Sequence, residues 1–252
     1  LQIRLTNEEK QWIQNHRYLR LGVDPNWPPF DFIDPNGNFH QGMSADFIKA
    51  LNERLGLDIQ LKLLDSWSDV IAAAKNRELD LVACLTATEE RSEYLNFSDP
   101  YLTYPYIIIT RDDFELISGI RDLAGLQVAV VNQYAVHEKI KALHPEISLV
   151  LSPNPQEGLL AVSTGKVDAF VGNLITSSYL IQQHSIANLK VAAPAGFSVD
   201  FEELRIGVRK DWPILVSILN KGLATITDEE KAAIKQKWFS IKYDKQVDTE
   251  YI

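Results

Sequence analysis

The order of strand-like and helix-like segments limits the fold more than any other feature of this sequence. Three strands alternate with two helices in the first third of the chain, and the same order returns after residue 125. The first unit is expected to have strands at 19–24, 57–64 and 79–85 with helices at 47–55 and 66–76, and the second to have strands at 126–131, 147–151 and 167–171 with helices at 136–143 and 154–165. Two such units predict an α/β protein with two open, mostly parallel sheets flanked by helices.

The segments outside these units indicate how the two sheets are joined. A further strand is expected at 204–209, followed by two helices that end near Trp238. The second unit alone is shorter than the roughly 100 residues of a compact domain, so we expect one lobe to be inserted into the other. The expected division is lobe 1 at 1–108 plus 197–252, lobe 2 at 113–193, and hinge strands near 107–112 and 193–197. Because ligands bind at the carboxyl ends of strands in open α/β sheets, both lobes would face one cleft.

Composition excludes several classes of protein. A hydrophobic content of 46% allows a sizeable core, and a net charge of -9 argues against a broad basic surface for nucleic acid or anionic lipid. The single cysteine, Cys84, can form neither an internal disulfide nor a CxxC metal site. No apolar stretch approaches the roughly 18 residues of a membrane helix, and no signal peptide opens the chain. Because the chain starts at Leu1 without an initiator methionine, we expect a processed chain or an excised fragment.

Aromatic residues stand in the loops after the expected strands. The loop Asp24–Phe30 contains three prolines, which stiffen it, and carries Trp27 and Phe30. Either aromatic could cap the core or line a pocket, and we favour the core for Phe30 and the pocket for Trp27. Trp67, at the start of a helix, fits both roles equally. These loops predict a partly aromatic cleft.

A candidate anion site follows the third strand. Thr86 and Thr88 offer hydroxyl groups at its end, and Arg91 follows one short turn later. A guanidinium beside hydroxyl and backbone donors suits bidentate binding of a carboxylate. The alternative is a surface salt bridge from Arg91 to a neighbouring acid, which we expect to be Glu89, Glu90 or Asp99.

Several motifs, in this order and spacing, resemble the bacterial family 3 extracellular solute-binding proteins. They are Leu21-Gly-Val-Asp-Pro-Asn-Trp-Pro-Pro-Phe30, Gly42-Met-Ser-Ala-Asp46, Leu85-Thr-Ala-Thr-Glu-Glu-Arg91 and Asn96-Phe-Ser-Asp-Pro-Tyr101. The resemblance implies a two-lobed Venus flytrap of the periplasmic-binding-protein type II fold, which binds polar amino acids or similar solutes without chemistry. The segment Leu5–His16 before the first strand is similar to the flytrap sensor domains of membrane-bound histidine kinases and diguanylate cyclases of the BvgS type. Such a domain would be extracytoplasmic and would belong to an inner-membrane protein.

The resemblance also implies ligand-binding residues in lobe 1. The matching positions are Asp24, Trp27, Trp67, Ala83, Cys84, Thr86 and Arg91. By this resemblance Arg91 would hold the ligand carboxylate with help from Thr86 and nearby backbone, and Trp27 and Trp67 would enclose the ligand body on two sides.

Lobe 2 departs from the family pattern at two places. Gln133, Tyr134 and Ala135 replace the frequent Gly/Ser/Thr-rich turn; their backbone can still donate to a carboxylate, while the bulk of Tyr134 narrows the cleft. Asn173 stands where amino-acid binders of the family usually have an aspartate that pairs with the ligand ammonium. Asparagine keeps hydrogen bonding but loses the charge, which favours a carboxylate without an ammonium group. Asn173 could instead be only the N-cap of a helix.

Enzyme and cofactor signatures are missing from the sequence. It contains no GxSxG, HExxH or CxxC motif, and the five histidines do not have metal-ligand spacing, so we expect neither a metal nor a cofactor. A dehydratase-like activity, as in some flytrap relatives, would need a buried acid or base, for which Asp24 is the best candidate.

Three hypotheses for function follow. The first is a sensor domain of a membrane-bound signalling protein, such as a two-component kinase, that binds an amino acid or small carboxylate and signals by lobe closure. The second is the free binding subunit of an ABC transporter, which would act with a permease. The polar tail Ser240–Ile252 favours the receptor. The third and least favoured is a cyclohexadienyl-dehydratase-like enzyme. A homodimer is possible in the full-length receptor.

Overall fold

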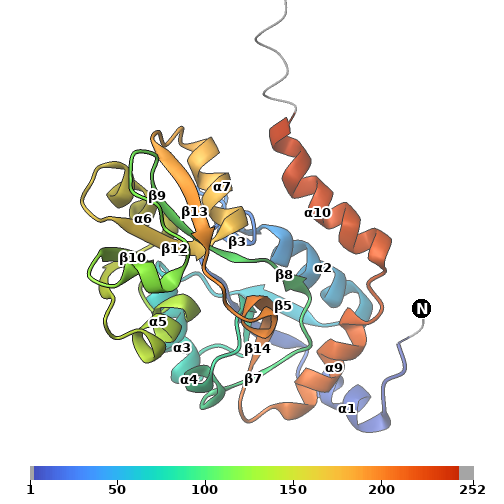
Figure 1. Ribbon diagram of the computed structural model, residues 1–252. Coiled ribbons are helices and arrows are strands. Elements are labelled where there is room, and N and C mark those ends of the chain that lie inside the picture. The colour runs from blue at the N-terminus through green and yellow to red at the C-terminus, as the bar shows by residue number, and fades with distance from the viewer. Residues whose placement is uncertain (1–2, 244–252) are drawn as a thin grey trace, which may run out of the picture.

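The computed structural model describes residues 3–243 and contains two large sheets covered by helices (Figure 1). The first sheet has the strand order β5-β1-β6-β14-β7, and β8 pairs with β14 beside this path. Its strands are β1 (Tyr18–Gly22), β5 (Asp58–Leu61), β6 (Leu81–Leu85), β7 (Leu95–Phe97), β8 (Leu102–Thr103) and β14 (Glu203–Arg209). Strands β5, β1 and β6 are parallel, whereas β14 is antiparallel to β6, β7 and β8. We call the part of the chain around this sheet lobe 1.

The second sheet has the order β11-β10-β12-β9-β13 and forms lobe 2. Its strands are β9 (Tyr106–Arg111), β10 (Gln127–Val131), β11 (Ser148–Ser152), β12 (Ala169–Asn173) and β13 (Leu189–Pro194). Strands β11, β10 and β12 are parallel, and β9 is antiparallel to both β12 and β13. The predicted fold class, two α/β lobes with mostly parallel sheets, is therefore confirmed.

The chain passes from lobe 1 to lobe 2 earlier than expected. Residues 106–108 belong to β9 in the second sheet, where Tyr106 pairs with Asn173 and Ile108 with Val171, whereas our division ends lobe 1 at 108 and begins the first hinge strand near 107. The run Tyr106–Ile109 is buried and rich in β-branched residues, which suits an interior strand of a sheet. The rest of the division stays a proposal, which the return of β14 to the first sheet supports.

Helices cover both sheets and follow the predicted order. The described helices are α1 (Asn7–Asn15), α2 (Met43–Leu55), α3 (Trp67–Lys75), α4 (Glu89–Ser92), α5 (Ala135–Leu143), α6 (Pro155–Ser163), α7 (Leu174–Gln183), α8 (Val199–Glu202), α9 (Pro213–Leu223) and α10 (Asp228–Tyr243), with a 3₁₀ turn η1 at Ile120–Leu123. The last helix continues beyond Trp238, where we expected it to end. The part of the polar tail from residue 244 on lies outside the described residues.

Local sequence signals explain where several helices begin and end. Thr6 and Glu9 form a capping box at the start of α1, Ser66 caps α3, and Asn154 caps α6 before Pro155. Gly56 ends α2 in the left-handed conformation, with φ 66°. A three-stranded sheet within the proline-rich loop region was not predicted; it consists of β2 (Asn26–Trp27), β3 (Asp31–Ile33) and β4 (His40–Gln41).

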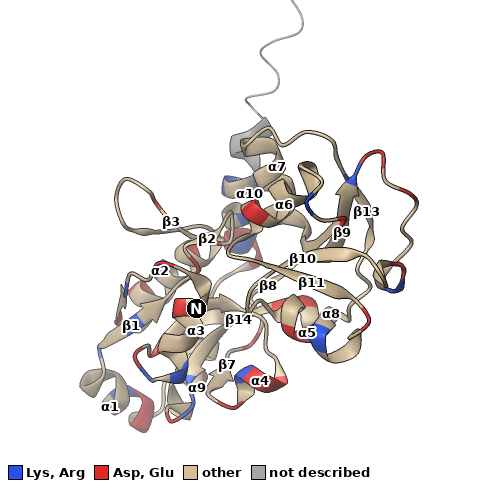
Figure 2. Cartoon of the chain, turned by 90° about the vertical axis from the view of Figure 1, so that its left-hand side faces the viewer, with Lys and Arg blue, Asp and Glu red and all other residues tan. Residues whose placement is uncertain are grey.

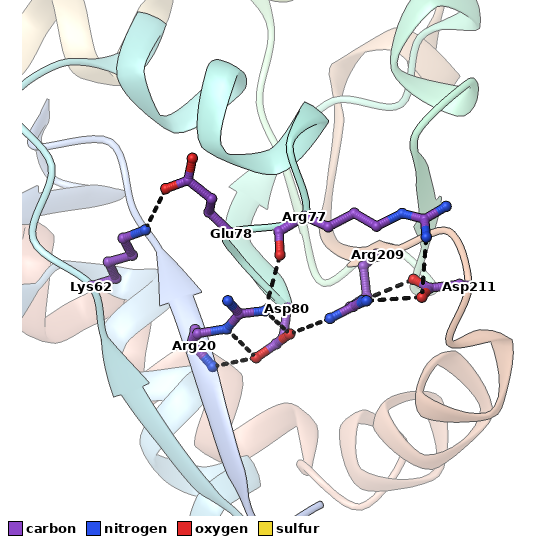
Figure 3. Close-up of polar contacts among 7 residues, drawn as sticks. All are labelled: Arg20, Lys62, Arg77, Glu78, Asp80, Arg209 and Asp211. Atoms are coloured by element: carbon purple, nitrogen blue, oxygen red, sulfur yellow. Dashed lines mark hydrogen bonds and ion pairs between the residues drawn. The ribbon is translucent and has the colours of Figure 1, made fainter.

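A network of charged residues around the buried Asp80 lies at the end of the first sheet where β6 begins (Figure 3). The carboxylate of Asp80 accepts hydrogen bonds from the backbone N and side chain of Arg20 on β1 at 2.7–3.0 Å. It also accepts one from Nη1 of Arg209, at the end of β14, at 3.0 Å. Asp80 therefore joins three neighbouring strands of lobe 1, β1, β6 and β14. It does so at the end of the sheet opposite to the one where β6 ends at Leu85.

Charged residues are interspersed over both lobes, as Figure 2 shows, while β10, β11 and β12 carry none. No helix within residues 3–243 is both long enough and apolar enough to cross a membrane. Within the same residues no group of three or more His, Cys, Asp or Glu side chains could hold a metal ion.

Candidate functional site

Most of the predicted site residues meet at one cavity between the two lobes. A cavity of about 20 Å³ has residues of both lobes in its wall. It is lined by Asp24, Trp27, Trp67, Cys84, Leu85, Thr86, Arg91, Tyr106, Tyr134 and Ala135. Eight of these are predicted site residues; Leu85 and Tyr106 were not predicted. This volume is sufficient for about one water molecule.

Three predicted residues do not line this cavity. Ala83 lies fully buried inside β6, where its carbonyl accepts a hydrogen bond from Tyr101 Oη at 2.6 Å. Gln133 contributes its backbone carbonyl to the lobe interface, and Asn173 lines a second cavity in lobe 2.

Arg91 is the buried cation of the cleft. Thr88 caps the short helix α4, and this turn directs Arg91 back under the end of β6, where its side chain is 2% exposed. Its Nη1 donates to the Thr86 carbonyl at 3.0 Å. The predicted alternative, a surface salt bridge to Glu89, Glu90 or Asp99, does not describe the position of Arg91, because no solvent-exposed partner is involved.

Arg91 has two partners in lobe 2, of which Gln133 is a predicted site residue and Glu138 is not. Its Nε donates to Oε1 of Glu138 at 3.0 Å, and its Nη2 donates to the Gln133 carbonyl at 2.9 Å. Glu138 lies on the first turns of α5, four residues after Tyr134, so both side chains share the helix face toward the cleft. That spacing is the one sequence signal that could have identified Glu138.

Asp24 is the buried acid of the cleft. Its backbone N donates to Asp31 Oδ2 at 2.9 Å, and its own Oδ1 accepts from the Asn26 backbone at 2.8 Å. Its Oδ2 accepts a hydrogen bond from the Tyr134 hydroxyl across the cleft. Burial raises the pKa of Asp24 to about 7, against the opposing effect of the Tyr134 and Asn26 hydrogen bonds.

Asp31 holds the loop that carries Asp24 in place. Its Oδ1 accepts hydrogen bonds from Ser44 Oγ at 2.5 Å and lies 2.5 Å from His40 Nε2. Both bonds tie β3 to the start of α2 and to β4, so the small sheet β2–β4 holds Asp24 and Trp27 at the cleft.

Tyr134 occupies the place between the two tryptophans that the resemblance assigns to a ligand. Its ring makes edge contacts with Trp27, at a centroid distance of 6.0 Å, and with Trp67, at 5.9 Å. Trp67 serves as both core and pocket residue, because it is 5% exposed and its Nε1 donates to the Gln133 carbonyl at 2.9 Å. Phe30, fully buried, is a core residue as we expected.

The turn of lobe 2 presents backbone as well as side chains to lobe 1. Gln133 has φ 60°, a left-handed conformation that costs a non-glycine residue roughly 1 kcal/mol. Its backbone N donates to His137 Nδ1 at 3.0 Å, which ties the turn to α5, and burial lowers the pKa of His137. Asn132 adds a bond from Nδ2 to Ser68 Oγ at 3.2 Å. One segment, 132–138, therefore makes all these contacts to lobe 1.

Asn173 acts as the N-cap of α7. Its Oδ1 accepts hydrogen bonds from the backbone N of Ile175 at 2.9 Å and of Thr176 at 3.3 Å. The role of helix cap, which we had kept open, is therefore present in the structure.

Known proteins with similar sequences come from two groups. The chain matches the model of the bacterial extracellular solute-binding proteins, family 3, over residues 19–241. It is 30% identical to the virulence sensor protein BvgS of Bordetella bronchiseptica, over 91% of this chain and 18% of that protein. It is 26% identical to the ABC transporter arginine-binding protein 1 of Escherichia coli, over 88% of this chain and 90% of that protein. The chain thus spans about a fifth of the length of the sensor relatives and most of the transport relative.

Solved structures with a similar fold come from the same two groups, sensor domains and solute-binding proteins. The periplasmic VFT2 domain of Bordetella pertussis BvgS superposes with a TM-score of 0.81 at 28% identity, covering 93% of this chain and 99% of that domain. An ancestral amino acid-binding protein, described as a precursor of cyclohexadienyl dehydratase, has a TM-score of 0.74 at 27% identity and covers 91% and 99%. With its two α/β lobes and the cleft between them, this chain belongs to the bacterial extracellular solute-binding proteins of family 3 and has their Venus flytrap fold.

Proposed function

We propose that this chain is the extracytoplasmic sensor domain of a membrane-bound signalling protein and binds an amino acid or small carboxylate between its lobes. The observation that carries the proposal is the position of Arg91, a buried guanidinium of lobe 1 whose remaining donors point into lobe 2. Such a group binds a carboxylate strongly because both charge and fork geometry match.

Lobe closure is the proposed signal. Glu138 presents to Arg91 the same chemical group that a ligand would present, and Tyr134 contacts the tryptophans that would enclose the ligand body. A ligand carboxylate would therefore replace the carboxylate of Glu138. The ligand would change the populations of the open and closed arrangements of the lobes only to the extent that it binds one of them more tightly than the other.

The setting in a membrane receptor is supported by the relatives. BvgS is a virulence sensor protein, and this chain matches one domain-sized part of it. By this likeness we place the chain in the periplasm as part of an inner-membrane protein whose remaining segments transmit the signal. A homodimer of the full-length receptor belongs to the same proposal.

A transport function is the second candidate. The arginine-binding protein of E. coli is matched over most of its length, so the same cleft could serve an ABC permease. We propose no catalytic activity, although Asp24 has the buried position and the raised pKa that a general acid or base would need. Turnover of a cyclohexadienyl acid by the purified chain would contradict this part of the proposal.

A ligand panel tests the proposal. Amino acids, small mono- and dicarboxylates and aromatic acids are screened by thermal shift, where a ligand at 100 times its Kd adds roughly 2.7 kcal/mol of stability. We expect the ligand found for the wild type to lose binding in Arg91→Ala and in the double variant Arg91→Ala/Glu138→Ala, which leaves no unpaired buried acid.

Arg121→Ala, on the exposed turn η1, is the matched control and should bind as the wild type does. Undiminished affinity in the folded Arg91 variants would remove Arg91 from the site. A hit only among acids without an amine would agree with the missing charge at Asn173, whereas a hit among amino acids would show that another group, such as Asp24, accepts the ammonium.

A further inference from the structure

Two cavities share the side chain of Tyr134 in their walls. The first, of about 20 Å³, contains the Arg91 end of the cleft. The second, of about 10 Å³, lies mainly in lobe 2, with Trp27 of lobe 1 in its wall. It is lined by Trp27, Tyr106, Tyr134, Pro155, Phe170, Val171, Gly172, Asn173, Thr176 and Ser177. Both cavities have Trp27, Tyr106 and Tyr134 in their walls. The side chain of Tyr134 therefore forms part of the partition between two spaces that would otherwise be adjacent.

The second cavity contains two buried hydroxyl groups that have nothing to bind. Thr176 and Ser177 are each 1% exposed, and within residues 3–243 neither Oγ atom has a hydrogen-bond partner. Burying a hydroxyl without a partner costs free energy, so such groups in a folded protein call for an explanation. Both residues line the cavity, so the two hydroxyl groups are buried beside it.

The chemistry of this cavity favours an uncharged group. Among the described residues, no Asp, Glu, Lys or Arg lines it. Two backbone N–H groups in the first turn of α7, those of Ile175 and Thr176, already donate to Asn173 Oδ1. They are therefore not available to an anion. A hydroxyl or carboxamide can both donate to and accept from Thr176 and Ser177, which matches the two side chains.

We propose that Tyr134 divides a single ligand chamber and that the half beyond it is a second subsite, in which Thr176 and Ser177 bind an uncharged hydroxyl or carboxamide of the ligand. This inference rests on the proposed function, because the Arg91 end holds the carboxylate of the same molecule. The ligand class is then an acid with a polar, uncharged group at its far end.

The test uses two acids of equal size, 5-hydroxypentanoate and hexanoate, which differ by a hydroxyl in place of a methyl group. In Tyr134→Ala, where the two spaces are joined, calorimetric titration should show at least about tenfold tighter binding of 5-hydroxypentanoate. Adding Thr176→Val and Ser177→Ala should bring the two dissociation constants to within about twofold, while the affinity for hexanoate stays the same. Ser178→Ala, on the exposed face of the same helix, should keep the tenfold preference.

A measurement without ligand covers the case in which Tyr134→Ala does not fold. Thr176→Val in the otherwise wild-type chain should leave the thermal midpoint unchanged or raise it, because the hydroxyl has no hydrogen bond to lose. A lowered midpoint would overturn the inference. Equal binding of both acids to Tyr134→Ala, or a preference that survives loss of both hydroxyls, would overturn the subsite while leaving the Arg91 site intact. Binding of neither acid would count against both.

Discussion

Two buried aspartates of lobe 1, Asp24 and Asp80, differ in how their charge is compensated. Asp80 lies before β6 and is bound by two arginines, Arg20 and Arg209, that belong to its own lobe. Asp24 follows β1 at the cleft end of the same sheet, has no cation bound to it among the described residues, and receives its side-chain partner, Tyr134, from the other lobe. Although burial raises both pKa values, the hydrogen bonds of Arg20 and Arg209 bring that of Asp80 below its usual range, whereas that of Asp24 reaches about 7.

The comparison separates stability from function within one sheet. At the far end, polar groups are satisfied inside the lobe, so their interactions stabilise the fold whatever the lobes do. At the cleft end, Asp24 and Arg91 gain their remaining hydrogen-bond partners only when lobe 2 is in contact. Free energy that depends on lobe contact is the kind that a ligand can compete with or reinforce. Four variants test this difference between the two ends of the sheet.

The largest expected effect is a pH dependence that comes from Asp24. Since its pKa is raised to about 7 from the usual 3.8, the folded closed chain holds a proton that the unfolded chain has lost between these values. The free energy of unfolding is therefore highest below about pH 4. It falls as the pH rises from there to about 7, by at most about 1.4 kcal/mol per pH unit. Urea unfolding at several pH values measures it.

Asp24→Asn is the control for this pH effect. All other titratable groups are the same in the two proteins, so the difference between wild type and variant isolates Asp24. Parallel curves for the two proteins from pH 4 to 7 would show that Asp24 is not the buried acid described here.

The next effect concerns Asp80→Asn, which should lower the free energy of unfolding by about 2 kcal/mol, because Asp80 is buried and accepts hydrogen bonds from two arginines. The arginines are partly exposed, which keeps the loss below that of a fully buried pair. Ligand affinity should be unchanged. The exposed Asp65→Asn is the matched control. A loss of ligand affinity in folded Asp80→Asn would remove the distinction between the two ends.

Trp67→Phe should have a smaller effect, located at the lobe contact. It removes the hydrogen bond from Nε1 to the Gln133 carbonyl, worth about 1 kcal/mol, and keeps an aromatic ring in the core. Small-angle scattering should therefore show a larger radius of gyration as the open arrangement gains population. Trp212→Phe, in lobe 1 away from the cleft, should not change the radius of gyration. The same change in both variants would argue against a specific role for Trp67.

The smallest effect is expected for Tyr134→Phe, which deletes only the hydroxyl that bonds Asp24. The loss should be about 1 kcal/mol or less. Because that bond lowers the pKa of Asp24, the upper end of the pH-dependent range should move to higher pH. Tyr18→Phe, on an exposed tyrosine, serves as control. An unchanged pH profile would mean that the two groups do not interact in solution.

Much of this could be predicted because the signals are local. Helix caps such as Thr6 and Asn154, and strand runs such as Leu81–Leu85, are readable within a few residues. The motif Leu85–Arg91 likewise placed Thr86 and Arg91 together at one strand end. The partner of Arg91 could not be found in this way, because Glu138 is distant in the sequence and meets it only through lobe contact.

Other features escaped for related reasons. The prolines between Asp24 and Phe30 obscured the short strands β2 and β3, which pair within that loop region. The second cavity depends on the side of α7 that carries Thr176 and Ser177, and nothing in the sequence distinguished these from the surface residue Ser178.

We expect Glu138 and a ligand carboxylate to compete for Arg91, and calorimetric titration of wild type and Glu138→Gln with the same carboxylate ligand measures this competition. The glutamine keeps the shape of the side chain but not its charge, so Arg91 should bind the ligand about tenfold more tightly, a gain of about 1.4 kcal/mol. Glu146→Gln, on an exposed acid of the same lobe, should leave the affinity unchanged. Equal affinity in wild type and Glu138→Gln would contradict the claim and would place the ligand away from Arg91.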